Sequence, residues 1–239
     1  MRSTARDGAP GTRRARHDGA MTLPPLSLAG TIDRAAIAPA VDLLADLVAR
    51  PEVGARWDEE SSCAGMTVGA LAWHLVNQPQ RVVEVLAGPA PDAEPITLDE
   101  HYARAAWLQQ DLDGPANVGV RERGAEQAEA GQAAAVAAAR EAHDALATTL
   151  AAAGPLVGLP WAGTALRTDD FLVTRLMEIV VHSDDLAASV DVPVPTFAPE
   201  TLGPVVTLLT DLALRRHGQD ALVRTLARPQ RAPGSISAF

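Results

Sequence analysis

The apolar residues between Leu28 and Val48 recur at steps of three and four positions. This is the period of an α-helix that buries one face and exposes the other. The pattern therefore predicts a first amphipathic helix, and Pro51 and Gly54 predict where it ends.

The helical period returns before the middle of the chain. Thr67 is a good N-cap for a second helix that runs towards Leu86, and we expect Pro79 to kink or break that helix. Residues 90–97 are rich in proline and predict a loop. A shorter helix is predicted over residues 98–110.

The pattern of the next segments is also helical. Residues 118–153 are dense in alanine and predict one long helix, interrupted at Gly131. Residues 156–168 predict a connection. The Thr-Asp-Asp sequence at 168–170 then predicts the cap of a strongly apolar helix that runs through Leu186.

The C-terminal segment begins with a proline-rich linker over residues 192–199. Two further helices are predicted over 199–217 and 219–228, separated by Gly218. Only residues 192–197 hint at the alternation of a strand. The helix over 199–217 is too apolar to stand in water, so we expect it to pack on the rest of the fold and to help wall a substrate pocket.

Together these elements predict an all-α fold, a helical bundle with a short helical C-terminal extension. We divide the chain into a disordered leader (1–24), the bundle (25–191) and the extension packed on it (192–239). The leader lacks the hydrophobic segment of a signal peptide.

Charge and composition exclude several classes of protein. The chain of 239 residues carries a net charge of −10, which opposes sequence-independent binding to nucleic acid. Its single cysteine, Cys63, excludes an intramolecular disulfide and a multi-cysteine metal cluster. No apolar run approaches the roughly 18 residues of a membrane span. We therefore expect a soluble, cytoplasmic protein without nucleic-acid or membrane partners, and the sequence leaves both a monomer and a homodimer open.

Three polar residues in apolar helices are candidate metal ligands. Glu178 and His182 are four residues apart, so they project from one face of their helix, where they must pair, bind a metal or face a cleft. By spacing alone, an ordinary pair on the helix surface explains them as well. His74 lies among apolar residues of the second helix, which is also typical of a core histidine. Together the three offer two nitrogens and one oxygen, which suits a divalent first-row metal with open positions.

Two segments carry a family resemblance, GMTVGALAWHL at 65–75 and RLMEIVVHSDDLA at 175–187. They resemble the mycothiol-dependent maleylpyruvate isomerase family of the DinB-like superfamily, and the resemblance follows residues 25–190 in helix order. It implies a DinB-like four-helix bundle that binds a divalent metal through His74, Glu178 and His182. We expect zinc, with nickel as a substitute acquired during purification. The end of the chain is similar to that of single-domain actinobacterial members.

The resemblance also implies a function. The family uses the low-molecular-weight thiol mycothiol as a cofactor, and a metal-coordinated thiol is deprotonated. We therefore expect a mycothiol-dependent S-transferase or isomerase that acts on a small electrophilic substrate, and the sequence does not separate these two reactions. A non-catalytic metal-containing bundle for small-molecule binding or stress response stays open, and a fourth protein ligand would favour it. A metal-dependent hydrolase is a further alternative.

Other polar residues have weaker assignments. The family uses an arginine for its acidic substrate, and Arg104 and Arg121 are the candidates here, although each is equally well explained as a solvated helix residue. Asp185 has the spacing to hold the free ring nitrogen of His182, or it is an ordinary helix residue. Cys63 precedes the second helix, and an inert loop cysteine is the simpler interpretation. Three histidines in polar surroundings are expected at the surface: His101, His143 and His217.

Overall fold

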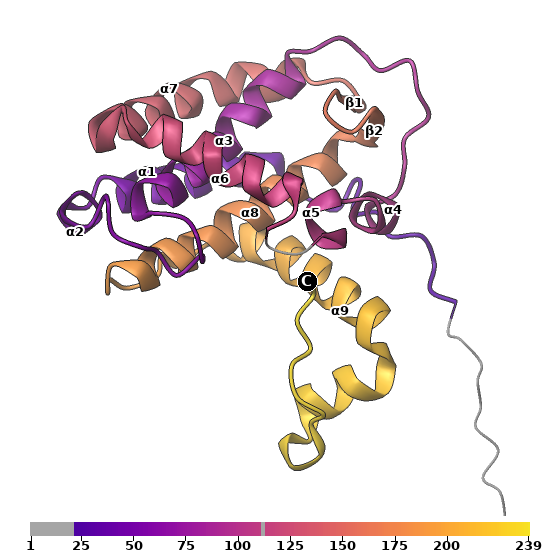
Figure 1. Ribbon diagram of the computed structural model, residues 1–239. Coiled ribbons are helices and arrows are strands. Elements are labelled where there is room, and N and C mark those ends of the chain that lie inside the picture. The colour runs from indigo at the N-terminus through magenta and orange to yellow at the C-terminus, as the bar shows by residue number, and fades with distance from the viewer. Residues whose placement is uncertain (1–21, 111–112) are drawn as a thin grey trace, which may run out of the picture.

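The computed structural model describes residues 22–110 and 113–239, and four long helices form its centre (Figure 1). They are α1 (Ile37–Val48), α3 (Val68–Leu86), α7 (Gly131–Ala152) and α8 (Thr168–Ser189). Each packs on at least two of the others, as the helices of a four-helix bundle do. The predicted all-α bundle is confirmed.

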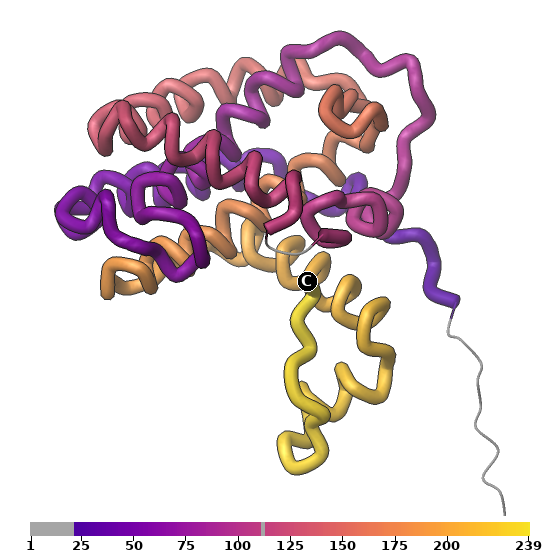
Figure 2. Tube along the Cα trace, in the orientation of Figure 1, coloured from indigo at the N-terminus to yellow at the C-terminus, as the bar shows by residue number. Residues whose placement is uncertain are grey.

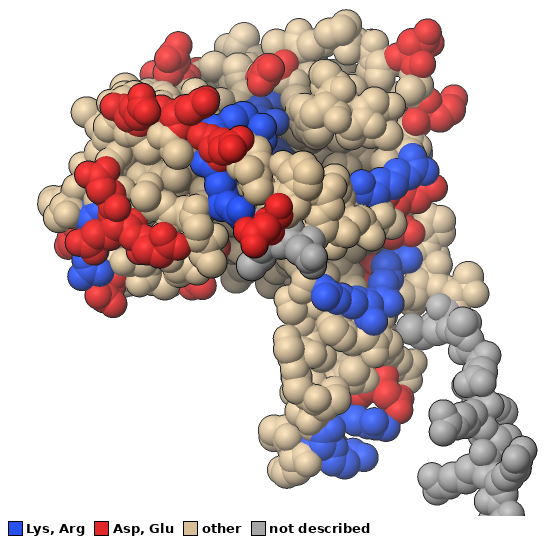
Figure 3. Space-filling model, viewed as in Figure 1, with Lys and Arg blue, Asp and Glu red and all other residues tan. Residues whose placement is uncertain are grey.

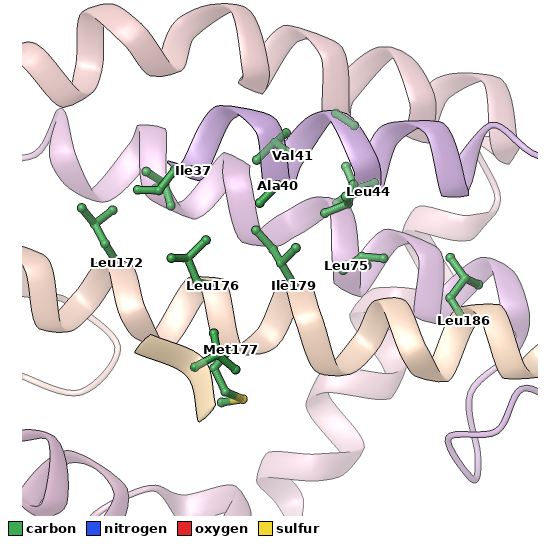
Figure 4. Close-up of a cluster of buried hydrophobic side chains, with 14 of the residues drawn as sticks. Ile37, Ala40, Val41, Leu44, Leu75, Leu172, Leu176, Met177, Ile179 and Leu186 are labelled. Atoms are coloured by element: carbon green, nitrogen blue, oxygen red, sulfur yellow. The ribbon is translucent and has the colours of Figure 1, made fainter. Parts of the chain in front are cut away.

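The core of the bundle is built from the apolar stripes of these helices. Figure 4 shows side chains of α1 and α8 pointing into the space between the two helices, with Leu75 of α3 beside them. The α1 and α8 side chains of this contact are at most 1% exposed: Ile37, Ala40, Val41, Leu44, Leu172, Leu176 and Ile179. The α7 face toward the core is mainly alanine, so its backbone can pack closely against α3.

The remaining elements surround the bundle. They are α2 (Pro51–Ala55), α4 (Leu98–Ala103), α5 (Ala106–Gln109), α6 (Pro115–Ala128), strands β1 (Leu156–Leu159) and β2 (Thr164–Arg167), α9 (Pro199–Ala227), and 3₁₀ turns at Arg34–Ala36 and Pro229–Arg231. Helix α6 packs on α3, and α9 packs on α8. Helix α9 has a kink at Gly218, and the trace in Figure 2 shows the C-terminal end of the chain running back towards the bundle.

Several predicted boundaries in the first half are wrong. The first helix begins at Ile37 rather than near Leu28, and Pro51 begins α2 instead of only ending α1. Helix α3 starts after its Thr67 cap as predicted but continues through Pro79 without a break. The helix predicted over 98–110 is two helices, because the backbone at Ala105 is extended.

The second half also differs from the prediction in two places. The segment 156–168 is an antiparallel hairpin, in which Leu156 pairs with Arg167 and Leu159 with Thr164. Residues 192–197, the only predicted strand, have no regular structure. The predicted interruptions are confirmed, because Gly131 and Gly218 both have positive φ angles, +79° and +80°.

The first turn of α8 holds the segment that precedes α1. Asp170 accepts hydrogen bonds from the Leu28 amide (2.6 Å) and the Ser27 hydroxyl (2.8 Å). Asp169 accepts from the Gly30 amide and pairs with Arg34, each at 2.7 Å. The two aspartates were predicted to cap α8, but they hold residues 27–33 in a non-helical path and pair with the first residue of the 3₁₀ turn, which explains the late start of α1.

The predicted leader lies outside the described residues except for its last three positions. There the carbonyl of Pro24 accepts a hydrogen bond from Arg215 of α9 (2.5 Å). None of the described helices combines the length and the apolar character that a membrane crossing requires.

Candidate metal centre and cleft

The three predicted ligands meet where α3 crosses α8. Glu178 and His182 are one turn apart on α8, and His74 faces them from α3. One carboxylate oxygen, Glu178 Oε2, lies 3.1 Å from His182 Nε2 and 3.4 Å from His74 Nε2. The three side chains keep only 16–22% of their surface exposed. The structure therefore brings the predicted set together.

The surrounding residues orient the His182 ring and hold the turn of α3 that carries His74. His182 Nδ1 lies 2.9 Å from Asp185 Oδ2, so the Nδ1–H can donate to that carboxylate and leave Nε2 free to act as a ligand. On α3, the buried side chain of Gln78 donates to the carbonyl of His74 (2.8 Å). Arg175 donates to Gln78 Oε1 (2.7 Å) and so links α8 to the same turn.

The charges of the centre depend on one another. Burial by itself raises the pKa of Glu178, but hydrogen bonds from His182 and His74 outweigh burial, and the pKa lies well below its usual range. Burial likewise lowers the pKa of His182. Hydrogen bonds with Asp185, Cys63 and Glu178 outweigh that effect and hold the pKa of His182 well above its usual value. Without a cation the site therefore favours an imidazolium beside a carboxylate.

The donor set fits a divalent metal. Ligand atoms of His74, Glu178 and His182 all lie within 4.8 Å of one another, so small side-chain movements bring them to the roughly 2.0–2.2 Å of metal–ligand bonds. Among the described residues, no other histidine, cysteine or carboxylate joins this group. Three protein ligands with open positions are typical of a catalytic rather than a structural site.

A cleft of about 680 Å³ opens beside the ligands. His74 and Glu178 lie in its wall, which is completed by α4, α5, α6 and the β1–β2 hairpin. Of the described residues, none from 192 onward lines the cleft, so the expectation that the extension forms its wall is wrong. The extension instead contacts a residue of the cleft wall: the Phe239 ring packs on the Trp107 ring, with centroids 5.2 Å apart.

Four arginines line this cleft, and three of them, on three different helices, differ from Arg104 in having no acidic partner within the described residues. Arg81 lies on α3, Arg123 on α6 and Arg175 on α8, and none of them forms an ion pair with a carboxylate in the described part of the chain. Burial lowers the pKa of Arg81, and the charges of Arg175 and Arg123 lower it further. Acidic side chains cover the end of the bundle near α2, whereas basic ones gather nearer the middle of the same face and along α9 (Figure 3).

The family model that describes the mycothiol maleylpyruvate isomerase N-terminal domain matches residues 37–187. That span holds α1, α3 and α7, all but the last two residues of α8, and every candidate ligand of the centre. The chain belongs to this family. Membership identifies residues 37–187 as a mycothiol-related, metal-binding domain of the DinB-like type. No curated protein and no solved structure matches the chain.

The other residues predicted from the family resemblance are placed differently. Asp185 contacts His182 as described above. Arg104 reaches the wall of the cleft, where its side chain is 57% exposed and lies 3.7 Å from Glu100. Arg121 is not part of the cleft wall; it pairs with Asp113 (3.2 Å).

Sequence reasoning missed part of the cleft. Arg81 follows His74 by seven residues and Arg175 precedes Glu178 by three, so both spacings place an arginine on the ligand face of its helix. That signal was available in the sequence. His101 was expected at the surface, but it lines the cleft and is half-buried. Nothing local in the sequence pointed to Trp161, which reaches the cleft only because 156–167 folds as a hairpin.

Proposed function

We propose that this chain is a metal- and mycothiol-dependent transferase or isomerase that acts on a small electrophile carrying carboxylate groups. The observation that supports this is the position of the candidate ligands, which adjoin a cleft with three guanidinium groups that have no carboxylate partner in the described chain. The absence of a fourth ligand from the described group argues against the alternative of a closed, non-catalytic metal site.

In this proposal His74, Glu178 and His182 hold the divalent metal, for which zinc is the natural choice with two imidazoles and a carboxylate. When bound, the metal lowers the pKa of a coordinated thiol, so that mycothiol is presented as a thiolate nucleophile. Asp185 keeps the Nδ1 proton of His182, which orients the ring and makes Nε2 the ligand atom.

The arginines bind and orient the substrate. A guanidinium makes two parallel hydrogen bonds to a carboxylate, and Arg81, Arg123 and Arg175 supply more positive charge than one carboxylate neutralises. We therefore assign two acidic groups to the substrate. Thr164 adds a buried hydroxyl at the cleft wall that has no hydrogen-bond partner among the described residues. The same guanidinium groups stabilise negative charge that develops on the substrate when a nucleophile adds to it.

The test uses the full chain, first stripped of metal and then reloaded with Zn²⁺. Mycothiol is offered together with maleylpyruvate, with other unsaturated dicarboxylic acids, and with uncharged electrophiles of similar size. Free thiol and substrate are measured separately, because an isomerase returns the thiol whereas a transferase consumes it. We expect turnover only with metal and mycothiol together, and faster turnover of the dicarboxylic acids.

Two variants serve as controls for this test. The variant Glu178→Gln should be inactive, and Asp184→Asn, an exposed position on the same helix, should behave as the wild type. If Zn²⁺-loaded protein neither changes its melting temperature with mycothiol nor turns over any electrophile, the proposed function is wrong.

A further inference from the structure

The loop that precedes α3 is a closed, hydrogen-bonded turn. Its ends pair as an isolated bridge between Glu60 and Thr67, and the Ser61 amide donates to the carbonyl of Met66 (2.9 Å). The carbonyl of Cys63 accepts from the Met66 amide (3.0 Å) and from the Ser61 hydroxyl (3.2 Å). The backbone on both sides of Cys63 is therefore fixed.

This loop is also fastened to α8. The Ser62 amide donates to Ser189 Oγ (2.9 Å), and the Ser62 hydroxyl donates to the carbonyl of Asp185 (2.8 Å). The two bonds attach the loop to the last turns of α8, one residue away from Cys63. They hold the thiol of Cys63 against the side of α8 that carries His182.

The consequence is a second group of ligand-type side chains. Cys63 Sγ, a ring nitrogen of His182 and a carboxylate oxygen of Asp185 all lie within 4.8 Å of one another. Asp185 approaches His182 at Nδ1, whereas Glu178 approaches the same ring at Nε2. The two carboxylates therefore lie at opposite ring nitrogens of His182, and the one at Nδ1 belongs to the second group.

We propose that Cys63, His182 and Asp185 form a second metal site, which takes a thiophilic divalent cation such as Cd²⁺ or Zn²⁺. Thiolate, imidazole and carboxylate are all zinc ligands, and the sulfur favours soft ions over the harder ones that an N₂O set accepts. The three residues are partly exposed, so water can reach the open position. The inference does not depend on the proposed reaction.

The two sites exclude each other through the shared ring. A neutral imidazole carries one proton, which stays on the nitrogen that does not bind the cation. A cation at Nε2 leaves the Nδ1 proton with Asp185, and a cation at Nδ1 leaves the Nε2 proton with Glu178. A soft ion at the second site therefore withdraws His182 from the set with His74.

The test is a titration of the metal-free full chain with Cd²⁺ alone. Cadmium bound to a thiolate absorbs in the ultraviolet, and because Cys63 is the only cysteine of the chain, the absorption reports this residue alone. We expect one equivalent of the band in the wild type and in H74A/E178Q, which leaves the second set intact. Cys63→Ser should lose the band, and bound Cd²⁺ should protect the wild-type thiol from a thiol reagent.

An exposed thiol without other ligands would also bind some Cd²⁺. The proposed site therefore requires that the affinity for Cd²⁺ depends on Asp185 as well as on Cys63. Asp185→Asn should weaken Cd²⁺ binding at least tenfold, whereas Asp184→Asn should leave it unchanged; circular dichroism checks that each variant is helical. No band in the wild type at saturating Cd²⁺, or equal affinity in Asp185→Asn, overturns the second site. Cys63→Ser should still bind Zn²⁺ through His74, Glu178 and His182, and this retained binding together with the lost Cd²⁺ band supports a second site that is separate from the first.

Discussion

The imidazole rings of His74 and His182 meet almost at right angles, with centroids 4.7 Å apart and an interplanar angle of 88°. The rings come from different helices, so this edge-to-face contact depends on how α3 and α8 pack against each other. Both Nε2 atoms point at the same oxygen of Glu178. A single carboxylate thus holds two imidazoles in the arrangement that a metal ion would take over.

Removal of the Glu178 carboxylate should change both the affinity for Zn²⁺ and the pKa of His182. We expect Glu178→Gln to weaken Zn²⁺ binding by more than the roughly 10- to 100-fold that loss of an outer partner costs. In the metal-free protein the pKa of His182 should fall, because one of the hydrogen bonds that raise it is lost. Calorimetry measures the first effect and NMR titration of the ring the second. An unchanged Zn²⁺ affinity would remove Glu178 from the ligand set.

The affinity for Zn²⁺ should depend on pH above the ordinary histidine range. Ligand histidines bind metal only when neutral, and the pKa of His182 without metal lies well above 6.5. Protons therefore compete at neutral pH already, and the affinity should rise continuously from pH 6 to pH 8. Dissociation constants at several pH values check this. A curve that is flat above pH 6.5 would contradict the raised pKa.

His101 should make the fold sensitive to acid. Burial, with the charge of Arg175, lowers the pKa of His101 to about 4, whereas in the unfolded chain it is near 6.5. The unfolded state binds the proton first, so stability is full above pH 6.5 and falls between pH 6.5 and 4, by on the order of 3 kcal/mol at most. His101→Gln should flatten the profile in urea unfolding. Equal slopes for both proteins would show that His101 is solvated.

Arg81 should bind substrate at the expense of stability. Loss of a hydrogen-bonded charge costs about 1.5–3 kcal/mol, or roughly 10- to 100-fold in affinity, so Arg81→Gln should raise KM for dicarboxylic substrates. The same change removes a charge that burial, Arg175 and Arg123 disfavour, so the melting temperature of the free protein should rise. Arg140→Gln, which instead breaks pairs with Asp42 and Asp46, is the control. A lower melting temperature for Arg81→Gln would contradict the view that burial and the charges of Arg175 and Arg123 make Arg81 destabilising.

The attachment of α9 to the bundle can be tested with two neighbouring residues. Leu208 is fully buried in the contact between α9 and α8, whereas Val206 on the same helix is 49% exposed. We expect Leu208→Ala to cost about 2–5 kcal/mol of unfolding free energy and Val206→Ala less than about 0.5 kcal/mol. Chemical denaturation compares the two. Similar small losses would mean that α9 does not contribute to the core.

The bundle could be predicted because its signal is local. Each long helix carries its own apolar stripe and its own stop, such as Gly131, whose positive φ ends one helix and begins the next. Boundaries set by distant residues could not be predicted. Leu28 belongs to a helical pattern, yet Asp170, 142 residues later, takes its amide. A tertiary hydrogen bond outweighs local periodicity there.

The same distinction applies to the site. That the three candidate ligands lie close together could be predicted, because Glu178 and His182 share one helix face and the family resemblance supplied His74. The cleft could not be predicted, because Trp161 reaches it from a hairpin whose four-residue strands are too short to show an alternating pattern. The guanidinium carbon of Arg81 lies over the Trp161 ring, 5.1 Å from its centroid. His101 was misplaced because its polar sequence neighbours hide the fact that Arg175 of another helix lies near it.

His74 and Glu178 are 104 positions apart in the sequence, so a metal bound between them would also affect the stability of the fold. An ion bound by these residues cross-links two helices that are neighbours only in the folded protein, so it binds the native state and not the unfolded chain. Each tenfold rise of free metal above its dissociation constant then adds about 1.4 kcal/mol to the folded state. A cell starved of that metal would hold more of this protein unfolded, where proteases degrade it, so metal supply would set the lifetime of the protein as well as its activity.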